Sequence, residues 1–314
     1  MLDSQPTLVS VIIPCHNQAR FLSEAIGSVL CQSYPLFEIV VVDDGSTDDT
    51  FEVASRYREV RCVRQKNQGL SAARNAGVGA SKGSYLVFLD ADDRLLRHAL
   101  QAGLECLTAH PECAFVYGHL QFIASDGSPL PTIKQVRVER DHCLQLLRGD
   151  YIWTPGVVMY RRTIFDSIDG FDTRIDACAD CDLNIRISRD YPVYCHGNVI
   201  LEYRQHDANM SGKSALMLKT ALAAHRFQLK YVKGNERYEA ASKIGKRAAQ
   251  DYFGRHLFNE VRAHVASGAL KSALAGLLLL LRYHPRGFAT YVSGALRRFV
   301  FRAKNRLGFF QVSR

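Results

Sequence analysis

No stretch of this chain is apolar for long. Its longest apolar run has nine residues, from Ala273 to Leu281, whereas a helix that spans a bilayer needs about 20. The first residues, MLDSQPTLVSVIIP, contain no basic segment ahead of a hydrophobic core, so no secretory signal is visible. The sequence therefore predicts neither a membrane-spanning nor an exported protein, and we expect a cytoplasmic location.

Acidic residues are missing from the C-terminal part of the chain. From Val261 to Arg314 there are ten Lys or Arg and no Asp or Glu. The first 260 residues are therefore nearly neutral, and the net charge of +9 belongs to the tail. A nucleic-acid-binding domain would carry basic residues over its folded surface, so we expect no nucleic-acid partner.

Disulfide bonds are not expected either. The nine cysteines are an odd number and lie mostly in predicted strands and helices, which is typical of reduced thiols in a core. Cys178 and Cys181 form a C-x-x-C pair. Without a second pair this is a poor zinc site, and two incidental thiols are favoured over redox control.

Strands and helices alternate in the first third of the chain. Short β-branched runs predict strands, and apolar residues at helical spacing predict the helices between them. The expected strands are VSVIIP (9–14), FEIVVVDDGS (37–46), VRCVRQ (60–65) and YLVFLDADD (85–93), and the expected helices are RFLSEAIGSVLCQ (20–32) and LSAARNAGVGAS (70–81). Ser46 or Thr47 is expected to cap a further helix after the second strand. This alternation predicts an α/β fold with a Rossmann-like, mostly parallel sheet flanked by helices.

Two of the expected strands end in carboxylates. Ligands of parallel sheets bind beyond the carboxyl ends of the strands, and this rule places six residues along one edge: Pro14, His16, Asp43, Asp44, Asp90 and Asp92. If the last strand continues through Asp92, then Asp90 and Asp92 point the same way and can share one cation. Their oxygen atoms suit Mn²⁺ or Mg²⁺. The alternative is that these acids cap the helix that begins near Leu95.

Several motifs occur in a fixed order along the chain. SVIIPCHNQARFLSEAIGSVLCQSY, FEIVVVDDGSTDDT and NQGLSAARNAGVGASKGSYLVFLDADD lie within 9–93, followed by DGFD (169–172), ADCDLNIR (179–186) and YRQHDANMS (203–211). Together they resemble the inverting family 2 glycosyltransferases of bacterial cell envelopes, which have the GT-A fold. The resemblance implies a donor-binding half over 1–110 and an acceptor-binding half over 111–212. The rest of the chain, over 213–314, lies outside these motifs and is expected from its own residues to be a helical, basic, membrane-associating region.

The resemblance also implies roles for individual residues. The nucleotide-binding residues would be Pro14, His16, Asp44, Arg74 and Asp90, with Asp92 as the metal ligand and Asp180 as the catalytic base. Trp153, Asp182 and His206 would contact the acceptor or the diphosphate. One departure from the family pattern is Ala179, where a Glu is common, and it puts the acceptor class in doubt.

Each of these roles has a structural alternative. Asp180 could be a helix cap, with Asp182 as the base instead. His16 could be a turn residue, Arg74 could lie on a solvated helix face, and His206 and Trp153 could be buried structural residues.

The chemistry explains why so few groups are needed. A diphosphate leaves readily once a divalent cation neutralises its developing charge, so no general acid is required. The acceptor hydroxyl needs a carboxylate to take its proton, an effect worth about 10²–10⁴ in rate. One base and one metal site therefore suffice for a single inverting displacement, unlike the two carboxylates of a glycosidase.

The region after Lys213 is expected to be helical, with breaks at Gly234 and Gly268. In YVSGALRRFVFRAKNRL the apolar residues Val292, Leu296, Phe299, Val300, Ala303 and Leu307 recur at helical spacing, and basic residues occupy the other faces. Such a helix can lie on an anionic membrane surface. The alternative is a helix packed on the catalytic domain, with its basic face in water.

Three functions remain in competition. The favoured one is a metal-dependent hexosyltransferase that uses UDP-sugar or dTDP-sugar and a lipid-linked or polysaccharide acceptor, peripheral on the inner face of the membrane. The second is a non-catalytic, membrane-associated sugar-nucleotide-binding module. The third is a nucleotidyltransferase, but PCHNQARF after the first strand lacks a Gly-rich or Lys-rich phosphate loop.

Overall fold

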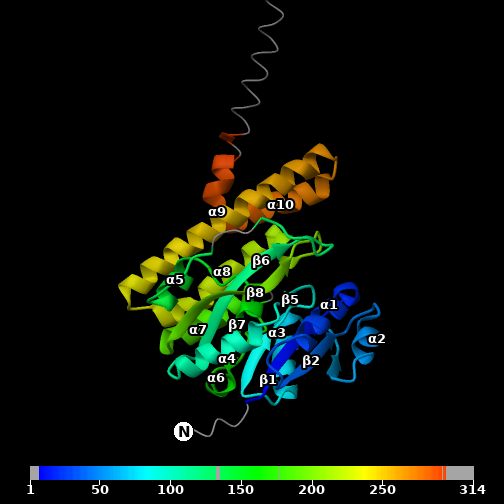
Figure 1. Ribbon diagram of the computed structural model, residues 1–314. Coiled ribbons are helices and arrows are strands. Elements are labelled where there is room, and N and C mark those ends of the chain that lie inside the picture. Colours follow the sequence, from blue (N-terminus) through cyan, green and yellow to red (C-terminus); the bar gives the residue numbers. More distant parts are fainter. Residues whose placement is uncertain (1–6, 132–134, 176, 292, 295–314) are drawn as a thin grey trace, which may run out of the picture.

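A mixed sheet forms the centre of the molecule in the computed structural model, which describes residues 7–131, 135–175, 177–291 and 293–294 (Figure 1). Eight strands lie in the order β3-β2-β1-β4-β7-β6-β8-β5. Their bounds are β1 (Val9–Cys15), β2 (Phe37–Asp44), β3 (Val60–Gln65), β4 (Tyr85–Phe88), β5 (Arg94–Leu95), β6 (Phe115–Ile123), β7 (Val158–Arg161) and β8 (Val193–Arg204).

Helices pack around this sheet and continue past it. The α-helices are α1 (Ala19–Leu30), α2 (Thr50–Ser55), α3 (Leu70–Ala80), α4 (Ala99–Ala109), α5 (His142–Arg148), α6 (Arg162–Ser167), α7 (Ala179–Asp190), α8 (Ser214–Val232), α9 (Glu236–Ala266) and α10 (Leu270–Tyr283). Short 3₁₀ turns cover Pro155–Val157 and Met210–Gly212.

The first four strands confirm the βαβ prediction. β1 pairs in parallel with β2 and with β4, and β2 pairs in parallel with β3. All seven residues of β1 are buried, as expected for a strand covered on both faces. α3 lies close to this sheet at Gly77, where an added Cβ would come within 2.3 Å of Cγ2 of Ile12. A larger residue at 77 would therefore push α3, and the site residue Arg74 on it, away from the strands.

The second half of the sheet is mixed. β7 is antiparallel to both β4 and β6, and β5 is antiparallel to β8, while β6 and β8 are parallel. The predicted mostly parallel arrangement therefore holds for the pairs among β1 to β4, and the antiparallel pairs involve β4 to β8.

The described part of the chain after the sheet is mostly helical, as predicted. α8 and α9 are separated at Gly234 and α9 and α10 at Gly268, with φ of +89° and +77°, values that glycine adopts without strain. In Figure 1 the α9–α10 hairpin projects beyond β6 and β8. Within the described part of the chain, no helix combines the length and the apolar character needed to cross a membrane. Of the predicted amphipathic helix over 292–307, only residues 293 and 294 are described, and the rest lies outside the described residues.

Two local predictions were wrong. The strand YLVFLDADD ends at Phe88, and its acidic end forms a turn instead of an extended strand. Neither Ser46 nor Thr47 caps α2, because the N-cap position is Asp49 and the Asp48 carboxylate accepts the N–H of Thr50. All nine cysteines are free, and only Cys31 is exposed, in agreement with the prediction of reduced thiols.

Candidate active site

A tight turn follows β4 and carries three carboxylates. The N–H of Asp93 donates to the carbonyl of Asp90 at 3.0 Å, which closes the turn and brings Asp90, Asp92 and Asp93 together. The backbone therefore forms a turn here, whereas the sequence suggested two side chains on one face of a continuing strand. The turn does not cap a helix either, because α4 begins at Ala99 with His98 at its N-cap.

Asp90 is held by a buried guanidinium. Arg74 lies on α3 and its side chain is only 3% exposed. Its Nη2 donates to Asp90 Oδ1 at 2.8 Å, and its Nε is buried without a hydrogen-bond partner in the described chain. Arg74 therefore faces inward, and the alternative of a solvated helix face is wrong.

Asp92 is held by His206. Nε2 of His206 lies 2.9 Å from Asp92 Oδ2, and the His206 side chain is 3% exposed. Because Nδ1 accepts the N–H of Ala208, we place the ring proton on Nε2, where it donates to Asp92. Burial and the neighbouring Asp90 charge raise the pKa of Asp92, and His206 partly opposes this shift.

Asp93 was not assigned a role from the sequence, although it is the most buried of the three acids. Its Oδ1 accepts the N–H of Arg204 at 2.9 Å, and its Oδ2 is buried without a partner among the described residues. Burial, followed by repulsion from Asp92 and Asp90, raises its pKa well above the usual value. The side chain of Arg204 is fully buried, and it donates to the Asp92 carbonyl and pairs with Glu24. This arginine fixes the position of the turn.

The ends of β1 and β2 carry the other residues that the sequence predicts to bind the nucleotide. Asp44 accepts the N–H groups of Gln68 and Gly69, both at 2.9 Å, so its carboxylate shapes the loop between β3 and α3. His16 is exposed, and its Nδ1 lies 3.0 Å from the Asp44 carbonyl oxygen. Pro14 is buried in β1 opposite Val42. All three lie at the carboxyl ends of their strands, as the topology requires.

Asp180 lies in the first turn of α7, which begins at Ala179 and has Cys178 at its N-cap. It is therefore inside the helix and not its cap. Its pKa is raised to about 7, first by burial and then by the negative charge of Asp150, while Arg74 acts in the opposite direction. A carboxyl group with this pKa is ionised about half the time at neutral pH, which suits a general base.

Asp182 has structural partners. Its side chain is 2% exposed and pairs with Arg186 at 2.8 Å, and its second oxygen accepts Nε2 of Gln228 at 2.7 Å. These bonds connect α7 to itself and to α8. A carboxylate bound in this way is less available for proton transfer than Asp180.

Asp150 was missed by the sequence analysis. Its Oδ1 accepts the N–H of Ile152 at 3.0 Å and lies 3.4 Å from that of Trp153, which forms a tight loop before β7. Trp153 has φ of +62°, is 39% exposed and stacks on Phe122 with ring centroids 6.0 Å apart. The loop thus presents an aromatic face instead of burying it. The only available signal for Asp150 was its position in DYIWTP, and a lone Asp before an aromatic pair is not specific.

α3 ties the two halves of the site together. Asn75 bonds the backbone of Phe171 through both its amide nitrogen and its amide oxygen, at 2.8 and 2.9 Å, and Ser71 donates to the Ile175 carbonyl at 2.7 Å. The loop over 171–175 leads into α7. Arg74 lies between these two residues on the helix. It pairs with Asp90, and its positive charge also opposes the rise in the pKa of Asp180.

The residues present fit a divalent cation at the β4 turn. Burial, followed by repulsion from neighbouring acids in the same turn, raises the pKa of Asp92 and of Asp93, and Asp93 Oδ2 has no hydrogen-bond donor in the described chain. Carboxylate oxygens are ligands that Mn²⁺ and Mg²⁺ accept. A bound cation would relieve the repulsion that raises the pKa of Asp92 and Asp93.

A second group of potential ligands lies at the turn between α4 and β6. It consists of His110, Glu112 and Cys113, whose ligand atoms lie within 4.8 Å of one another. Here ordinary contacts account for the cluster, because Glu112 pairs with His110 at 3.4 Å and contacts the Cys113 sulfur at 3.7 Å. It lies before β6, away from the residues of the β4 turn.

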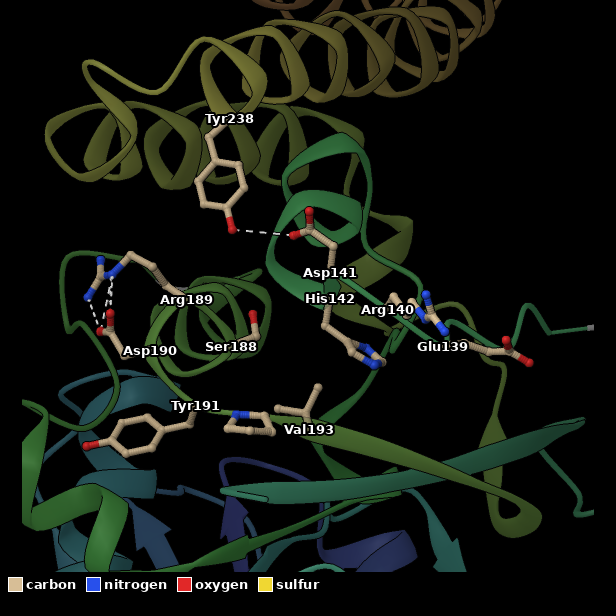
Figure 2. A pocket seen from close by; sticks show the side chains of 11 residues that line it. Glu139, Arg140, Asp141, His142, Ser188, Arg189, Asp190, Tyr191, Val193 and Tyr238 are labelled. Carbon is tan, nitrogen blue, oxygen red and sulfur yellow. Dashed lines mark hydrogen bonds and ion pairs between the residues drawn. The ribbon is translucent and has the colours of Figure 1, made fainter. Parts of the chain in front are cut away.

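A hollow of about 480 Å³ lies elsewhere on the acceptor half (Figure 2). None of the predicted site residues lines it. Three of its charged side chains already have partners: Asp141 accepts from Tyr238 at 3.3 Å, and Arg189 pairs with Asp190 at 2.7 Å. We therefore place the active site at the strand ends and not in this hollow.

Comparison with known proteins shows the family of this chain. The chain matches the model of glycosyl transferase family 2 over residues 10–168, just over half its length, and it belongs to that family. It is 35% identical over 128 residues to TuaG of Bacillus subtilis, a putative teichuronic acid biosynthesis glycosyltransferase, and the match covers 39% of this chain and 50% of TuaG.

Solved structures share the fold. S. aureus TarS 1-349 in complex with UDP-GlcNAc has a TM-score of 0.64 at 16% identity, over 88% of this chain and 82% of that one. The mannosyltransferase PcManGT of Pyrobaculum calidifontis in complex with GDP-Man and Mn²⁺ has a TM-score of 0.60 at 19% identity, over 94% and 88%. The fold is GT-A, as the sequence motifs predicted.

Proposed function

We propose that this protein transfers a sugar from a nucleoside diphosphate sugar to an acceptor hydroxyl, with inversion at the anomeric carbon. The donor would lie along the ends of β1, β2 and β4, and the acceptor would lie between Asp180 and the loop that carries Trp153. Asp180 would take the proton of the acceptor hydroxyl as that oxygen attacks the anomeric carbon and the nucleoside diphosphate leaves.

The position of Asp180 supports its assignment as the base over Asp182. The carboxylate of Asp182 is committed to Arg186 and Gln228, whereas burial and Asp150 raise the pKa of Asp180 to about 7. A base with a pKa near the working pH combines sufficient ionisation with the strongest proton affinity. Trp153, half-exposed beside this region, offers a flat apolar face against which a sugar ring can stack.

Asp92 would hold the divalent cation, with Asp90 beside it and His206 orienting the Asp92 carboxylate. When bound, Mn²⁺ or Mg²⁺ would neutralise charge on the leaving diphosphate. Asp90 would accept a hydrogen bond from the ribose, and Arg74 would keep it ionised and in place. Pro14, His16 and Asp44 would contact the base and the ribose.

The relatives suggest the substrate class. TarS has been solved with UDP-GlcNAc, and TuaG is named for the synthesis of an envelope polysaccharide. We therefore favour UDP or dTDP in the donor and a lipid-linked or polysaccharide acceptor of the cell envelope. The enzyme would act on the inner face of the membrane, attached through its C-terminal helices.

One observation carries the proposal. Asp90 and Asp180 are distant in the sequence and lie in different halves of the fold, yet both interact with the buried Arg74. A donor-side carboxylate and a carboxyl group with a pKa near neutrality therefore belong to one site. This arrangement is what transfer between two substrates requires.

Thermal unfolding with nucleotides tests the proposal. The purified protein would be heated with UDP, dTDP, GDP or CMP, each with and without Mn²⁺, beside Asp92→Asn. A ligand at a hundred times its dissociation constant stabilises a protein by about 2.7 kcal/mol. We expect one diphosphate to raise the unfolding midpoint only with metal, and Asp92→Asn to abolish this. Binding without any turnover of the matching nucleotide sugar would favour the non-catalytic module instead.

A further inference from the structure

Four leucines form an exposed stripe along α10. Leu270, Leu274, Leu278 and Leu281 are 68%, 58%, 58% and 51% exposed. Their spacing of four, four and three residues places them on one face of the helix. We call these four residues the leucine ridge. Single exposed leucines are ordinary, but a continuous stripe of this kind marks an interaction surface.

The packing of α10 on α9 fixes the direction of the ridge. Ala273, Gly276 and Leu280 form the buried face of α10 and lie in one apolar cluster with Leu257 and Val261 of α9. A Cβ at Gly276 would come within 2.3 Å of Cγ2 of Val261, so the glycine allows the two helices to approach closely. Rotation of α10 to bury the ridge would break this contact.

The charged residues of α10 are all positive. Lys271 and Arg282 are exposed, and their helical positions place them along the edge of the ridge away from the buried face. From residue 261 onward the sequence has basic residues and no Asp or Glu. Two copies of this face would bring like charges together, whereas an anionic surface would complement them.

We propose that the leucine ridge lies in the interface of a membrane that contains anionic lipids. The leucines would enter the boundary between head groups and acyl chains, and Lys271 and Arg282 would contact lipid phosphates. The inference rests on the membrane association proposed above and gives it a named surface within the described residues. Because the α9–α10 hairpin projects beyond the sheet (Figure 1), a flat bilayer can approach the ridge.

Vesicle flotation of the full-length protein tests this assignment. The probes are vesicles of phosphatidylcholine alone and vesicles with added phosphatidylglycerol. The test variant is Leu274→Asp with Leu278→Asp. The matched control is Leu229→Asp with Ile244→Asp, on α8 and α9, whose side chains are 54% and 51% exposed but lie outside the ridge. Both variants keep the basic residues after position 294, so a difference between them reports the ridge itself.

We expect the wild type to float with the anionic vesicles and much less with the neutral ones. The ridge variant should bind at least about tenfold more weakly, since each Asp places a charge where the wild type would insert a leucine into the membrane. The control should bind like the wild type. Equal binding by the two variants, or no binding by the wild type, would overturn the assignment. So would a wild-type dimer on size-exclusion chromatography that only the ridge variant loses, because a second copy would then cover the leucines.

Two further readouts keep the result interpretable. Circular dichroism and thermal unfolding should show that both variants are folded, which is expected because all four substituted side chains are exposed. Stabilisation by nucleotide and Mn²⁺ in solution should be the same in the wild type and the ridge variant. The donor-site proposal and the membrane proposal can therefore fail separately.

Discussion

The two edges of the candidate site hold their carboxylates in opposite ways. On the donor edge, Asp90 and Asp92 each have a positively charged or hydrogen-donating partner, Arg74 and His206. On the acceptor edge, Asp180 faces a second negative charge, Asp150, and its pKa is about 7. A carboxylate with a fixed partner is suited to holding a ligand in place. A carboxyl group whose pKa lies near neutrality is suited to accepting a proton, because its ionised form binds a proton more strongly than an ordinary carboxylate does.

This contrast separates binding from proton transfer. Changes at the donor edge should weaken the nucleotide or the metal, and changes at the acceptor edge should affect turnover and its pH dependence. The same logic distinguishes Asp180 from Asp182, which lies two residues away but is paired like a structural group.

The largest effect is expected from Asp180→Asn. Loss of the base should lower kcat by about 10²–10⁴-fold, and nucleotide binding with Mn²⁺ should persist.

The raised pKa of Asp180 means that the folded state holds its proton more tightly than the unfolded state, so wild-type stability falls as pH rises from about 4 to about 7. The variant lacks this titration, and its stability advantage over the wild type should be greatest above pH 7. Urea unfolding at several pH values would measure the difference in the free energy of unfolding between the two proteins. Equal pH dependence in both proteins would contradict the raised pKa of Asp180.

Asp182→Asn should instead destabilise the fold. Removing this carboxylate leaves Arg186, only 13% exposed, without its ion pair, and breaking a buried pair in this way costs about 3 kcal/mol. Urea denaturation at pH 7 would measure the loss, and turnover per folded molecule should stay near that of the wild type. A stable but inactive Asp182→Asn would reverse the roles of the two residues.

His206→Ala should weaken the metal site without removing it. Groups that orient a metal-binding carboxylate contribute about 10–100-fold to metal affinity, so the Mn²⁺ concentration needed for half-maximal stabilisation by nucleotide should rise by about that factor. His110→Ala is the matched control, since His110 belongs to the other potential ligand cluster. If His110→Ala has the larger effect, the metal site lies at the α4–β6 turn.

Asp150→Asn should have the smallest effect, on pH dependence alone. Removing the negative charge of Asp150 should lower the pKa of Asp180, because the ionised form is then repelled less. The acid limb of the kcat profile should therefore move to lower pH, by less than about one unit. Asp190→Asn, at the far end of α7, should leave the limb unchanged. An acid limb that moves to higher pH would show that Asp150 does not act through its charge.

The sequence predicted the donor half well because that half is local. Buried β-branched runs and the helices between them follow from short-range periodicity, and strand β3 has the predicted bounds. The parallel arrangement then brings the strand ends together without further information. The turn after β4 escaped prediction because an apolar strand does not reveal where its extended backbone ends.

The rest of the site depends on contacts between distant residues. Arg204 fixes the turn at Asp92 and Asp93, and Asn75 of α3 holds the loop before α7. No periodicity predicts such pairs. Asp150 reaches Asp180 only because antiparallel strands and α7 bring its loop there, so its effect could not be anticipated from the sequence.

The central claim is that Asp92 and Asp180 serve one reaction in different capacities. Its most direct test is a pair of measurements on Asp92→Asn and Asp180→Asn: affinity for the nucleotide that stabilises the wild type, with Mn²⁺, and turnover of the corresponding nucleotide sugar. We predict that Asp92→Asn loses the metal-dependent affinity, whereas Asp180→Asn keeps the affinity and loses the turnover. Normal turnover in Asp180→Asn, or unchanged metal-dependent binding in Asp92→Asn, would contradict the account.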